Sequence, residues 1–318
     1  MVESKHQWKA WLYLSPAIVL LGIFTVWPII NTVRMSLLVD FQYLKVNVSG
    51  YNPAFGFSNF IKVFGAPGYL QSMFNTILLT VLTVPLSTIL ALLISVALHS
   101  IKPLQRLYQT IFFLPYVTNS IAIGLVFMTM FKRVGTAFGE AGEVVISNGL
   151  VNNFLGLFGV APITWDNGGD PTTFSYWASI LFAVIYIVWN ALPFKILILL
   201  GGLQSVNKQY YEAAKVDGTS KARVFTRITV PLLSPMITYV VITSFIRGFK
   251  EYSSLVGLFG DVSVLKVKGL NTMVGYIYQS LQIDHKEGLA SAGALILFVI
   301  IFIVTMINLK ISKKKTHY

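Results

Sequence analysis

The chain contains no cysteine and little charge. It has 318 residues with four histidines, and only 11% of the residues are charged. The absence of cysteine excludes disulfides, thiolate nucleophiles and Cys-ligated metal sites. The histidines His6, His99, His285 and His317 are scattered without metal-ligand spacing, so we predict no metal site.

Apolar residues are abundant instead. Hydrophobic residues make up 55% of the chain and the mean hydropathy is +0.71, whereas soluble domains carry roughly 25% charged residues. The net charge of +12 raises the question of nucleic-acid binding, which needs basic residues interleaved with aromatics on one face. Here Lys and Arg lie mainly between long apolar runs. This pattern favours a basic membrane protein, and we predict no nucleic-acid partner.

Six segments are long and apolar enough to cross a membrane, which takes roughly 20 residues in a helix. They cover approximately residues 11–33, 73–98, 108–131, 174–200, 232–249 and 289–309. The first run is longer than the roughly 7–15 apolar residues of a cleaved signal peptide, so we expect a retained anchor. The sequence therefore predicts an all-α polytopic membrane protein with about six transmembrane helices. It predicts a tail over 1–10, a transmembrane domain over 11–309 and a basic tail over 310–318.

The distribution of charge predicts the orientation. With both termini in the cytoplasm, the inner segments hold thirteen cations and three acids, while the outer loops hold ten cations and nine acids. Lys195, inside the fourth predicted helix, completes the count. Cytoplasmic loops carry the excess of Lys and Arg, so both termini are predicted to be cytoplasmic.

The predicted helices contain many prolines. Each proline removes a backbone hydrogen bond and kinks its helix, which membrane helices tolerate when neighbouring helices satisfy the freed carbonyls. Such kinks suit a helix bundle around a pathway. The prolines within apolar runs are Pro16, Pro28, Pro85, Pro115 and Pro193.

The most informative segment is the inner connection between the fourth and fifth predicted helices, residues 205–231. Its first half is helix-like, its second half is basic and amphipathic, and Pro231 precedes re-entry into the membrane. Gly218 stands between the halves, where glycine tolerates the left-handed conformation that ends a helix. We therefore predict a tight helix–turn–helix. Ala213 and Ala214 leave a smooth surface that another protein can approach closely.

This connection resembles the signature of the membrane subunits of binding-protein-dependent ABC importers. That signature is Glu-Ala-Ala, three residues, Gly, nine residues, Ile, one residue and Leu-Pro. The matching residues are Glu212, Ala213, Ala214, Gly218, Ile228, Val230 and Pro231. Val230 replaces the leucine, and Val206 and Asn207 stand where a proline often precedes the motif.

Other segments are similar to the carbohydrate branch of this family, near the maltose-type permeases, so the resemblance covers nearly the whole chain. These segments are Leu14-Ser15-Pro16, Trp27-Pro28, Phe112-Phe113-Leu114-Pro115-Tyr116 and Asp170-Pro171.

The resemblance implies a division of labour. In this family the loop forms a coupling helix that docks in a cleft of a separate ATPase subunit. Glu212, Ala213, Ala214, Asp217 and Gly218 would make that contact, with Gly218 setting the turn. The chain has no Gly-x-x-x-x-Gly-Lys-Ser/Thr phosphate loop, which agrees with ATP and Mg²⁺ being used by the partner ATPase and no cofactor being bound by this chain.

The resemblance also implies an assembly in a bacterial inner (cytoplasmic) membrane, in contact with lipid. It consists of a second homologous permease subunit, two ATPase subunits and an extracytoplasmic solute-binding protein that delivers an oligosaccharide.

Two windows match the sugar contacts of maltose-type permeases. Aromatic faces stack on sugar rings, and amides and charges bond hydroxyl groups. The residues are Trp189, Asn190, Phe194, Arg247, Gly248, Glu251 and Tyr252. The two charges leave three interpretations open: an acidic sugar, an Arg247–Glu251 pair one helical turn apart, or charges that snorkel to the outer interface.

Other functions remain as alternatives. A related importer of a non-sugar solute such as a polyol phosphate would share the coupling motif. A membrane enzyme would need an organised site, for which only Glu140 and Glu143 offer an acid–base pair. A channel or secondary transporter would need no ATPase and would usually show internal repeats.

Overall fold

The computed structural model describes residues 7–101, 105–132, 134–138, 144–169 and 171–315. These ranges are predominantly helical, as predicted. An antiparallel hairpin of β1 (Val134–Phe138) and β2 (Val144–Ser147) is an addition that the sequence did not predict. The alternative acid–base pair, Glu140 and Glu143, lies outside the described residues.

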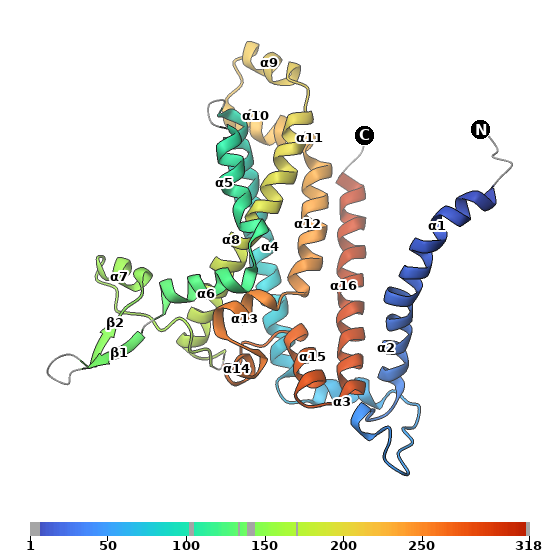
Figure 1. The fold of residues 1–318 in the computed structure, drawn as a ribbon. Helices are drawn as coiled ribbons and strands as arrows, with labels where there is room; N and C mark the ends of the chain where they lie inside the picture. The colour runs from blue at the N-terminus through green and yellow to red at the C-terminus, as the bar shows by residue number, and fades with distance from the viewer. Residues whose placement is uncertain (1–6, 102–104, 133, 139–143, 170, 316–318) are drawn as a thin grey trace. The chain divides into compact units, whose positions relative to one another are not determined.

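Figure 1 labels the elements along the chain. The first are α1 (Gln7–Leu21), the π-helical turn η1 (Gly22–Val26), α2 (Trp27–Leu37), the 3-10 turn η2 (Tyr43–Lys45), α3 (Ser58–Gly65), α4 (Tyr69–Ser100), α5 (Gln105–Val117), α6 (Ser120–Phe131), α7 (Leu150–Gly156) and α8 (Phe174–Ser205). The others are α9 (Gln209–Val216), α10 (Lys221–Val224), the π-helical turn η3 (Phe225–Thr229), α11 (Val230–Leu232), α12 (Ser234–Phe249), α13 (Ser253–Phe259), α14 (Val262–Val267), α15 (Met273–Gln282) and α16 (Glu287–Lys315).

The long apolar helices coincide with the predicted transmembrane segments. Four helices are long and apolar enough to cross a membrane by themselves. Two helix pairs, each sharply bent, reach that length only when the two helices of a pair are taken as one span, which gives up to six spans in the described part of the chain. Predicted segments 73–98 and 174–200 lie within α4 and α8. The prediction of an all-α polytopic membrane protein is confirmed. The four unbent spans are Trp8–Leu37, Tyr69–Ser100, Phe174–Ser205 and Glu287–Ser312.

The third predicted segment, 108–131, is not one continuous helix. It consists of α5 and α6, which meet at an angle of 100°. Pro115 lacks the N–H that would bond the preceding turn. The Asn119 Oδ1 then accepts a hydrogen bond from the backbone N–H of Ile121 at 2.9 Å, which starts α6 as a separate, capped helix. The predicted single span is therefore corrected to a bent pair.

The chain divides into two compact units. The first contains Met1–Tyr69 and Ile277–Val299, and the second contains Leu70–Tyr276 and Ile300–Tyr318. Both clusters of buried apolar residues lie in the second unit. One surrounds Phe182 of α8, and the other surrounds Leu199 of the same helix. The core of the second unit is therefore built around α8.

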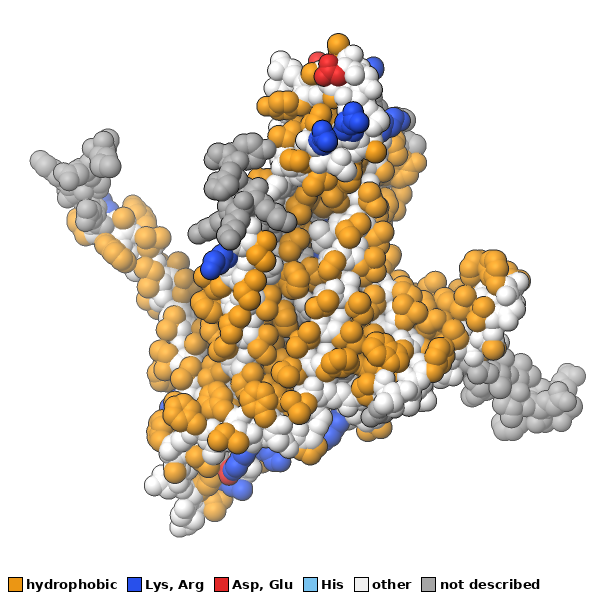
Figure 2. Space-filling view, turned by 180° about the vertical axis from the view of Figure 1, so that it is seen from behind, with side chains coloured by type: hydrophobic (Ala, Val, Ile, Leu, Met, Phe, Trp, Pro, Cys, Tyr) orange, Lys and Arg blue, Asp and Glu red, His pale blue; other side chains and the backbone are white. Residues whose placement is uncertain are grey.

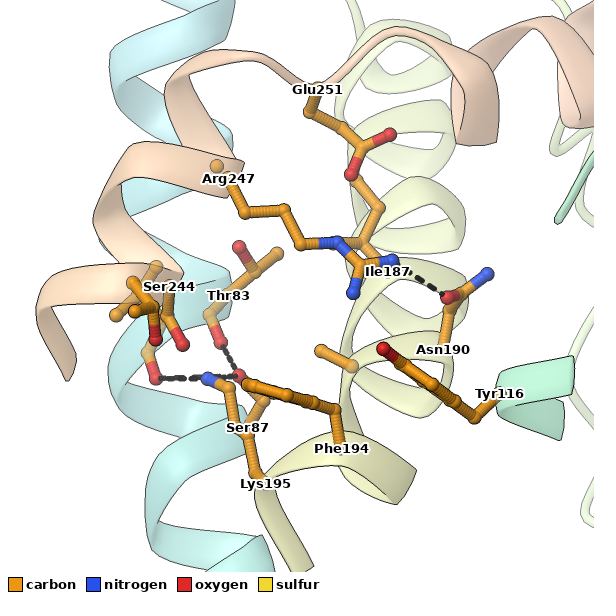
Figure 3. Close-up of a pocket in the computed structure, with 14 residues that line it drawn as sticks. Thr83, Ser87, Tyr116, Ile187, Asn190, Phe194, Lys195, Ser244, Arg247 and Glu251 are labelled. Atoms are coloured by element: carbon orange, nitrogen blue, oxygen red, sulfur yellow. Dashed lines mark hydrogen bonds between the residues drawn. The ribbon is translucent and has the colours of Figure 1, made fainter. Parts of the chain in front are cut away.

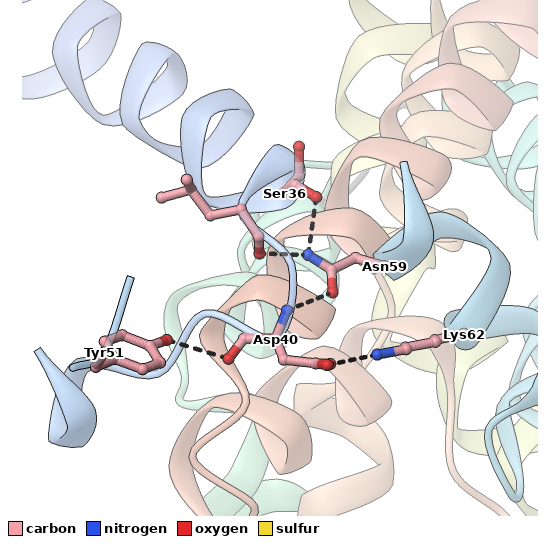
Figure 4. A network of polar contacts seen from close by, with 6 residues as sticks. Ser36, Asp40, Tyr51, Asn59 and Lys62 are labelled. Atoms are coloured by element: carbon pink, nitrogen blue, oxygen red, sulfur yellow. Dashed lines mark hydrogen bonds and ion pairs between the residues drawn. The ribbon is translucent and has the colours of Figure 1, made fainter. Parts of the chain in front are cut away.

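In the first unit, Asn59 of α3 closes the end of α2 (Figure 4). Its buried side-chain amide donates to the carbonyls of Ser36 at 3.0 Å and Leu38 at 2.8 Å. The last carbonyls of a helix have no partner within the helix, so such a donor stabilises its end. Its Oδ1 accepts from the backbone N–H of Asp40 at 3.2 Å, and Asp40 also pairs with Lys62. These bonds hold Asp40 at a φ of 51°, a left-handed conformation unusual for a non-glycine residue.

In the second unit, α4 carries a stripe of buried hydroxyl groups. Members of the stripe donate to the carbonyl one turn earlier, as Thr76 does to Ser72 at 2.7 Å and Ser95 does to Ala91 at 2.6 Å. The hydroxyl groups can therefore be buried among apolar side chains, because their protons already have carbonyl acceptors within α4. The stripe comprises Ser72, Thr76, Thr80, Thr83, Ser87 and Ser95, each at most 3% exposed.

The start of α4 binds the loop that precedes α15. Asn75 donates from Nδ2 to the carbonyls of Gly269 at 2.9 Å and Asn271 at 2.8 Å. Its Oδ1 accepts from the hydroxyl of Tyr176 on α8 at 2.7 Å. The buried Asn75 amide thus joins α4, α8 and the loop before α15 through hydrogen bonds within the protein.

The helices α6 and α13 touch through glycine. A Cβ built at Gly124 would lie 2.8 Å from the Cα of Gly257, and one built at Gly257 would lie 3.0 Å from the Cα of Ile121. Such distances leave no room for a side chain, so the two backbones are in direct contact.

We expect Gly124→Val to destabilise the protein, because its side chain must push α13 away. Overpacking of this kind costs about 1–3 kcal/mol. The matched control is Gly201→Val on α8, where a Cβ meets nothing within 4 Å. Thermal unfolding of the detergent-purified chain, followed by tryptophan fluorescence, should show a melting temperature several degrees lower for Gly124→Val. Equal melting temperatures for the two variants would refute the close contact.

Candidate functional site

The predicted helix–turn–helix forms between α9 and α10 in the second unit. Gly218 has a φ of +63°, as the sequence predicted for a left-handed glycine. Its N–H donates to the carbonyl of Lys215 at 3.2 Å, and the N–H of Thr219 donates to Ala214 at 2.9 Å. These two bonds satisfy the last carbonyls of α9 in the pattern of a Schellman motif. The turn is therefore locally fixed.

The α9 helix offers a free face. Ala214 is buried, whereas Glu212, Ala213 and Asp217 are exposed and Val216 is 88% exposed. In Figure 1, α9 and α10 form one end of the second unit. Figure 2 shows charged side chains gathered there, above a largely hydrophobic flank. An exposed valine and alanine beside a carboxylate suit contact with another protein better than contact with water.

A second feature is a cavity of about 240 Å³ inside the second unit (Figure 3). The side chains around it come from α4, α5, α8, α12 and the connection between α12 and α13. It is lined by Thr83, Val84, Ser87, Tyr116, Ile187, Asn190, Ala191, Phe194, Lys195, Thr243, Ser244, Arg247, Gly248 and Glu251. Hydroxyl, amide and charged groups thus meet in one place between apolar helices.

Lys195 lies at the inner wall of this cavity and is 3% exposed. Its Nζ donates to the hydroxyls of Ser87 at 2.7 Å and Thr88 at 3.0 Å, and more weakly to the carbonyl of Val84 at 3.4 Å. All three partners belong to α4, so the α8 lysine binds the hydroxyl stripe.

Arg247 faces Lys195 across the cavity from α12 (Figure 3). Its Nη2 donates to the Oδ1 of Asn190 at 3.3 Å. Asn190 in turn donates from Nδ2 to the hydroxyls of Ser120 at 2.9 Å and Tyr186 at 3.2 Å. This network fixes the orientation of the Asn190 amide so that its oxygen points at the guanidinium.

Glu251 is the cavity's carboxylate, and it is engaged locally. Its Oε1 accepts from the backbone N–H groups of Tyr252 at 3.2 Å and Ser254 at 3.1 Å, at the start of α13. Among the described residues, no ion pair within 4.0 Å joins Glu251 to Arg247. The sequence alternative of an Arg247–Glu251 pair is therefore not formed.

The structure brings together five of the seven residues in the two predicted sugar windows: Asn190, Phe194, Arg247, Gly248 and Glu251. The other two lie elsewhere. Trp189 packs against Phe127, with ring centroids 5.0 Å apart, and Tyr252 packs against the core around α8.

Sequence reasoning missed several lining residues. Lys195 carried a signal, because it is the single charged residue inside the fourth predicted segment, 174–200. Thr83, Ser87 and Tyr116 carried none, since hydroxyl groups are common in membrane helices. Tyr116 stacks on Phe194 with ring centroids 5.9 Å apart and planes 20° apart, which gives the cavity an aromatic edge.

Comparison with known proteins gives matches over most of the chain. The family model described as binding-protein-dependent transport system inner membrane component matches residues 84–317. The inner membrane ABC transporter permease protein YcjO of Escherichia coli (strain K12) is 29% identical over 301 residues, covering 95% of this chain and 93% of that protein. The arabinooligosaccharides transport system permease protein AraP of Bacillus subtilis (strain 168) is 28% identical, covering 95% and 88%.

A third relative is the sulfoquinovosyl glycerol transport system permease protein SmoG of Agrobacterium fabrum, 28% identical over 99% of this chain and 97% of that protein. Among solved structures, a chain of a bacterial ABC transporter involved in the import of the acidic polysaccharide alginate matches with a TM-score of 0.75. Its identity is 19%, and 98% of each chain is covered. At that identity the likeness supports the fold alone.

We expect Gly218→Ala to loosen the end of α9. Nothing lies within 4 Å of a Cβ there, so the cost is purely conformational, about 1–2 kcal/mol for a left-handed non-glycine residue. Hydrogen–deuterium exchange should show the Thr219 amide exchanging several-fold faster. Gly218→Asn serves as the matched variant and should exchange more slowly than Gly218→Ala, because asparagine tolerates this conformation. Wild-type exchange in Gly218→Ala would contradict the turn.

Proposed function

Because the chain belongs to the family of binding-protein-dependent transport system inner membrane components, we propose that it is the membrane-spanning permease of an ATP-driven importer of sugars or oligosaccharides. It receives substrate from an extracytoplasmic binding protein and passes it to the cytoplasm. The single observation that carries this proposal is the family match over residues 84–317, which includes the α9–α10 turn and the lining residues of the cavity apart from Thr83.

The substrate class rests on the relatives. The names of AraP and of LacF, a lactose transport system permease, state saccharide transport, and each is 28–29% identical to this chain. The aromatic edge and the hydrogen-bonding groups of the cavity agree with this class, because sugar rings present apolar faces and many hydroxyls.

We place the chain in a bacterial inner membrane as a multi-pass protein with both termini in the cytoplasm. The excess of cations in the inner segments supports this orientation. The turn between α9 and α10 is then cytoplasmic and the α13–α15 segment is extracytoplasmic. The domain organisation follows, with tails over 1–10 and 310–318, a transmembrane domain over 11–309 and the coupling loop at 205–231.

The coupling helix is α9. In an importer without its own phosphate loop, ATP hydrolysis must reach the membrane helices through a contact, and α9 offers one at the cytoplasmic end. Glu212, Ala213 and Val216 provide the exposed surface. The Schellman turn at Gly218 fixes the connection between α9 and α10. A movement of α9 is therefore passed to α10 and through η3 to α12. Two ATPase subunits and a second permease complete the proposed transporter.

The cavity is the proposed substrate pathway. Its volume of about 240 Å³ is below the roughly 300 Å³ at the lower end of small-molecule sites. Arg247 and Tyr116 are exposed in the single chain, so one side of the cavity has no wall. A second permease subunit facing this side would complete the pathway.

We expect Glu212→Lys to uncouple transport from ATP hydrolysis, because it reverses the charge on the contact surface of α9. In proteoliposomes containing the complete transporter, saccharide uptake should fall at least tenfold while the permease remains inserted and ATP hydrolysis continues. Normal uptake by Glu212→Lys would remove the coupling role.

Two variants serve as controls for this experiment. Glu212→Gln removes the charge without reversing it and should lose less uptake. Lys266→Glu reverses an exposed charge on α14, far along the second unit from α9 (Figure 1), and should change neither uptake nor hydrolysis. A loss of uptake in Lys266→Glu equal to that in Glu212→Lys would mean that charge reversal acts nonspecifically.

A further inference from the structure

The cavity between α4, α8 and α12 holds two basic side chains and one carboxylate. The basic side chains are Lys195 and Arg247, and the carboxylate is Glu251 (Figure 3). The Oε1 of Glu251 accepts hydrogen bonds from two backbone N–H groups at the start of α13. Among the described residues, no ion pair within 4.0 Å involves either basic side chain. Basic groups thus outnumber carboxylates two to one at the cavity.

Three oxygen acceptors of α4 surround the Nζ of Lys195. The Ser87 hydroxyl donates to the carbonyl of Thr83, and the Thr88 hydroxyl donates to the carbonyl of Val84 at 2.6 Å. Both hydroxyl protons are thus committed, and only oxygen lone pairs face the Nζ. With the Val84 carbonyl they give the Nζ three acceptors, all on α4.

The guanidinium of Arg247 has more N–H donors than the described residues accept hydrogen bonds from. An arginine has five N–H donors in a planar fork that matches a carboxylate in two parallel bonds. The described residues give this fork a single hydrogen bond, to Asn190 at 3.3 Å. Arg247 is exposed in the single chain and labelled at the cavity in Figure 3. The remaining donors are available to a ligand.

We infer that the cavity selects saccharides that carry an anionic oxygen group, such as the carboxylate of a uronic acid. This inference rests on the proposed function and names the substrate class of the same site. Arg247 binds the anionic group directly, and Lys195 supplies positive charge from the inner wall. Tyr116 and Phe194, stacked at 5.9 Å, provide the edge on which the sugar ring rests.

Two features of the site set the expected preference. Charges at membrane depth are costly unless they are paired or face a polar cavity, so an anionic substrate compensates the cations where a neutral one does not. Hydrogen bonds from an ionised donor such as the guanidinium are roughly twice as strong as those between neutral groups. Carboxylates and sulfates share this chemistry, and the test separates them.

The test uses the complete transporter in liposomes with its own binding protein and two matched pairs of probes. One pair is trigalacturonate and its methyl ester, which differ in charge and hardly in size. The other pair is lactose 3′-sulfate and lactose. The measured quantity is the ratio of anionic to neutral uptake, compared between variant and wild type. Because the binding protein is the same throughout, its own preference cancels in this comparison.

The variants are Arg247→Gln and Lys195→Met. Each should lower the anionic-to-neutral ratio at least fivefold for the pair that the transporter accepts. A fall in the trigalacturonate pair alone assigns a carboxylate, and a fall in the sulfate pair alone assigns a sulfate. Lys266→Gln removes an exposed cation on α14, outside the cavity, and should leave both ratios unchanged.

Ratios that stay at the wild-type value in Arg247→Gln would overturn the inference, even if the buried Lys195→Met variant fails to fold. Import of the neutral members alone by the wild-type transporter would also overturn it, and would leave the importer proposal standing. Import of neither member of either pair, with ATP hydrolysis intact, would remove saccharides from the proposed function and the inference with them.

Discussion

The rest of the structure depends on the pairing of polar groups inside an apolar bundle. In a membrane no water reaches the helix flanks, so each polar group at that depth must find a partner within the protein. The α4 helix meets this constraint by turning its hydroxyls back onto its own carbonyls, as between Thr80 and Thr76 at 2.7 Å. The hydroxyl stripe can therefore be buried against other helices without unpaired donors.

The site is built on that stripe. Because the hydroxyl protons of Ser87 and Thr88 are already donated to carbonyls, their oxygens are left as acceptors for the Nζ of Lys195. The same helix meets α12 closely, since a Cβ at Gly248 would lie 2.9 Å from the Thr80 side chain. These contacts place a lysine of α8 and an arginine of α12 at one cavity. Beyond the far end of α8, the fixed turn after α9 presents the exposed face that we propose as the contact with another subunit.

The sequence predicted the parts of the fold that depend on local properties. Length and hydropathy are sufficient for α4 and α8, since both are continuous apolar helices. Spacing is sufficient for Gly218, because a glycine between two helix-like halves can adopt the left-handed conformation that ends a helix without a steric penalty. The windows around Asn190 and Arg247 came from the family resemblance, and five of their seven residues line the cavity.

The remaining features depend on how helices meet, which hydropathy does not encode. The bend between α5 and α6 was missed because both halves are apolar and only Asn119 marks the new helix start. Trp189 and Asn190 are adjacent in sequence, yet they project to different sides of α8, where Asn190 enters the cavity and Trp189 meets Phe127. The contacts of Lys195 could not be predicted, because they depend on the register of α8 against α4. The hairpin of β1 and β2 was missed because its sequence has no clear alternation of apolar and polar residues.

The most direct measurement of the central claim, that the cavity is a water-filled transport pathway, uses the absence of cysteine. Ser244→Cys places one thiol at the cavity, and Ile89→Cys places one on the apolar face of α4, where the native side chain is 58% exposed. A thiol reacts as its thiolate, which requires water. In the complete transporter, a membrane-impermeant methanethiosulfonate should modify Ser244→Cys at least tenfold faster than Ile89→Cys, at a rate that changes when ATP is added. Equal, ATP-independent rates at the two positions would contradict the pathway.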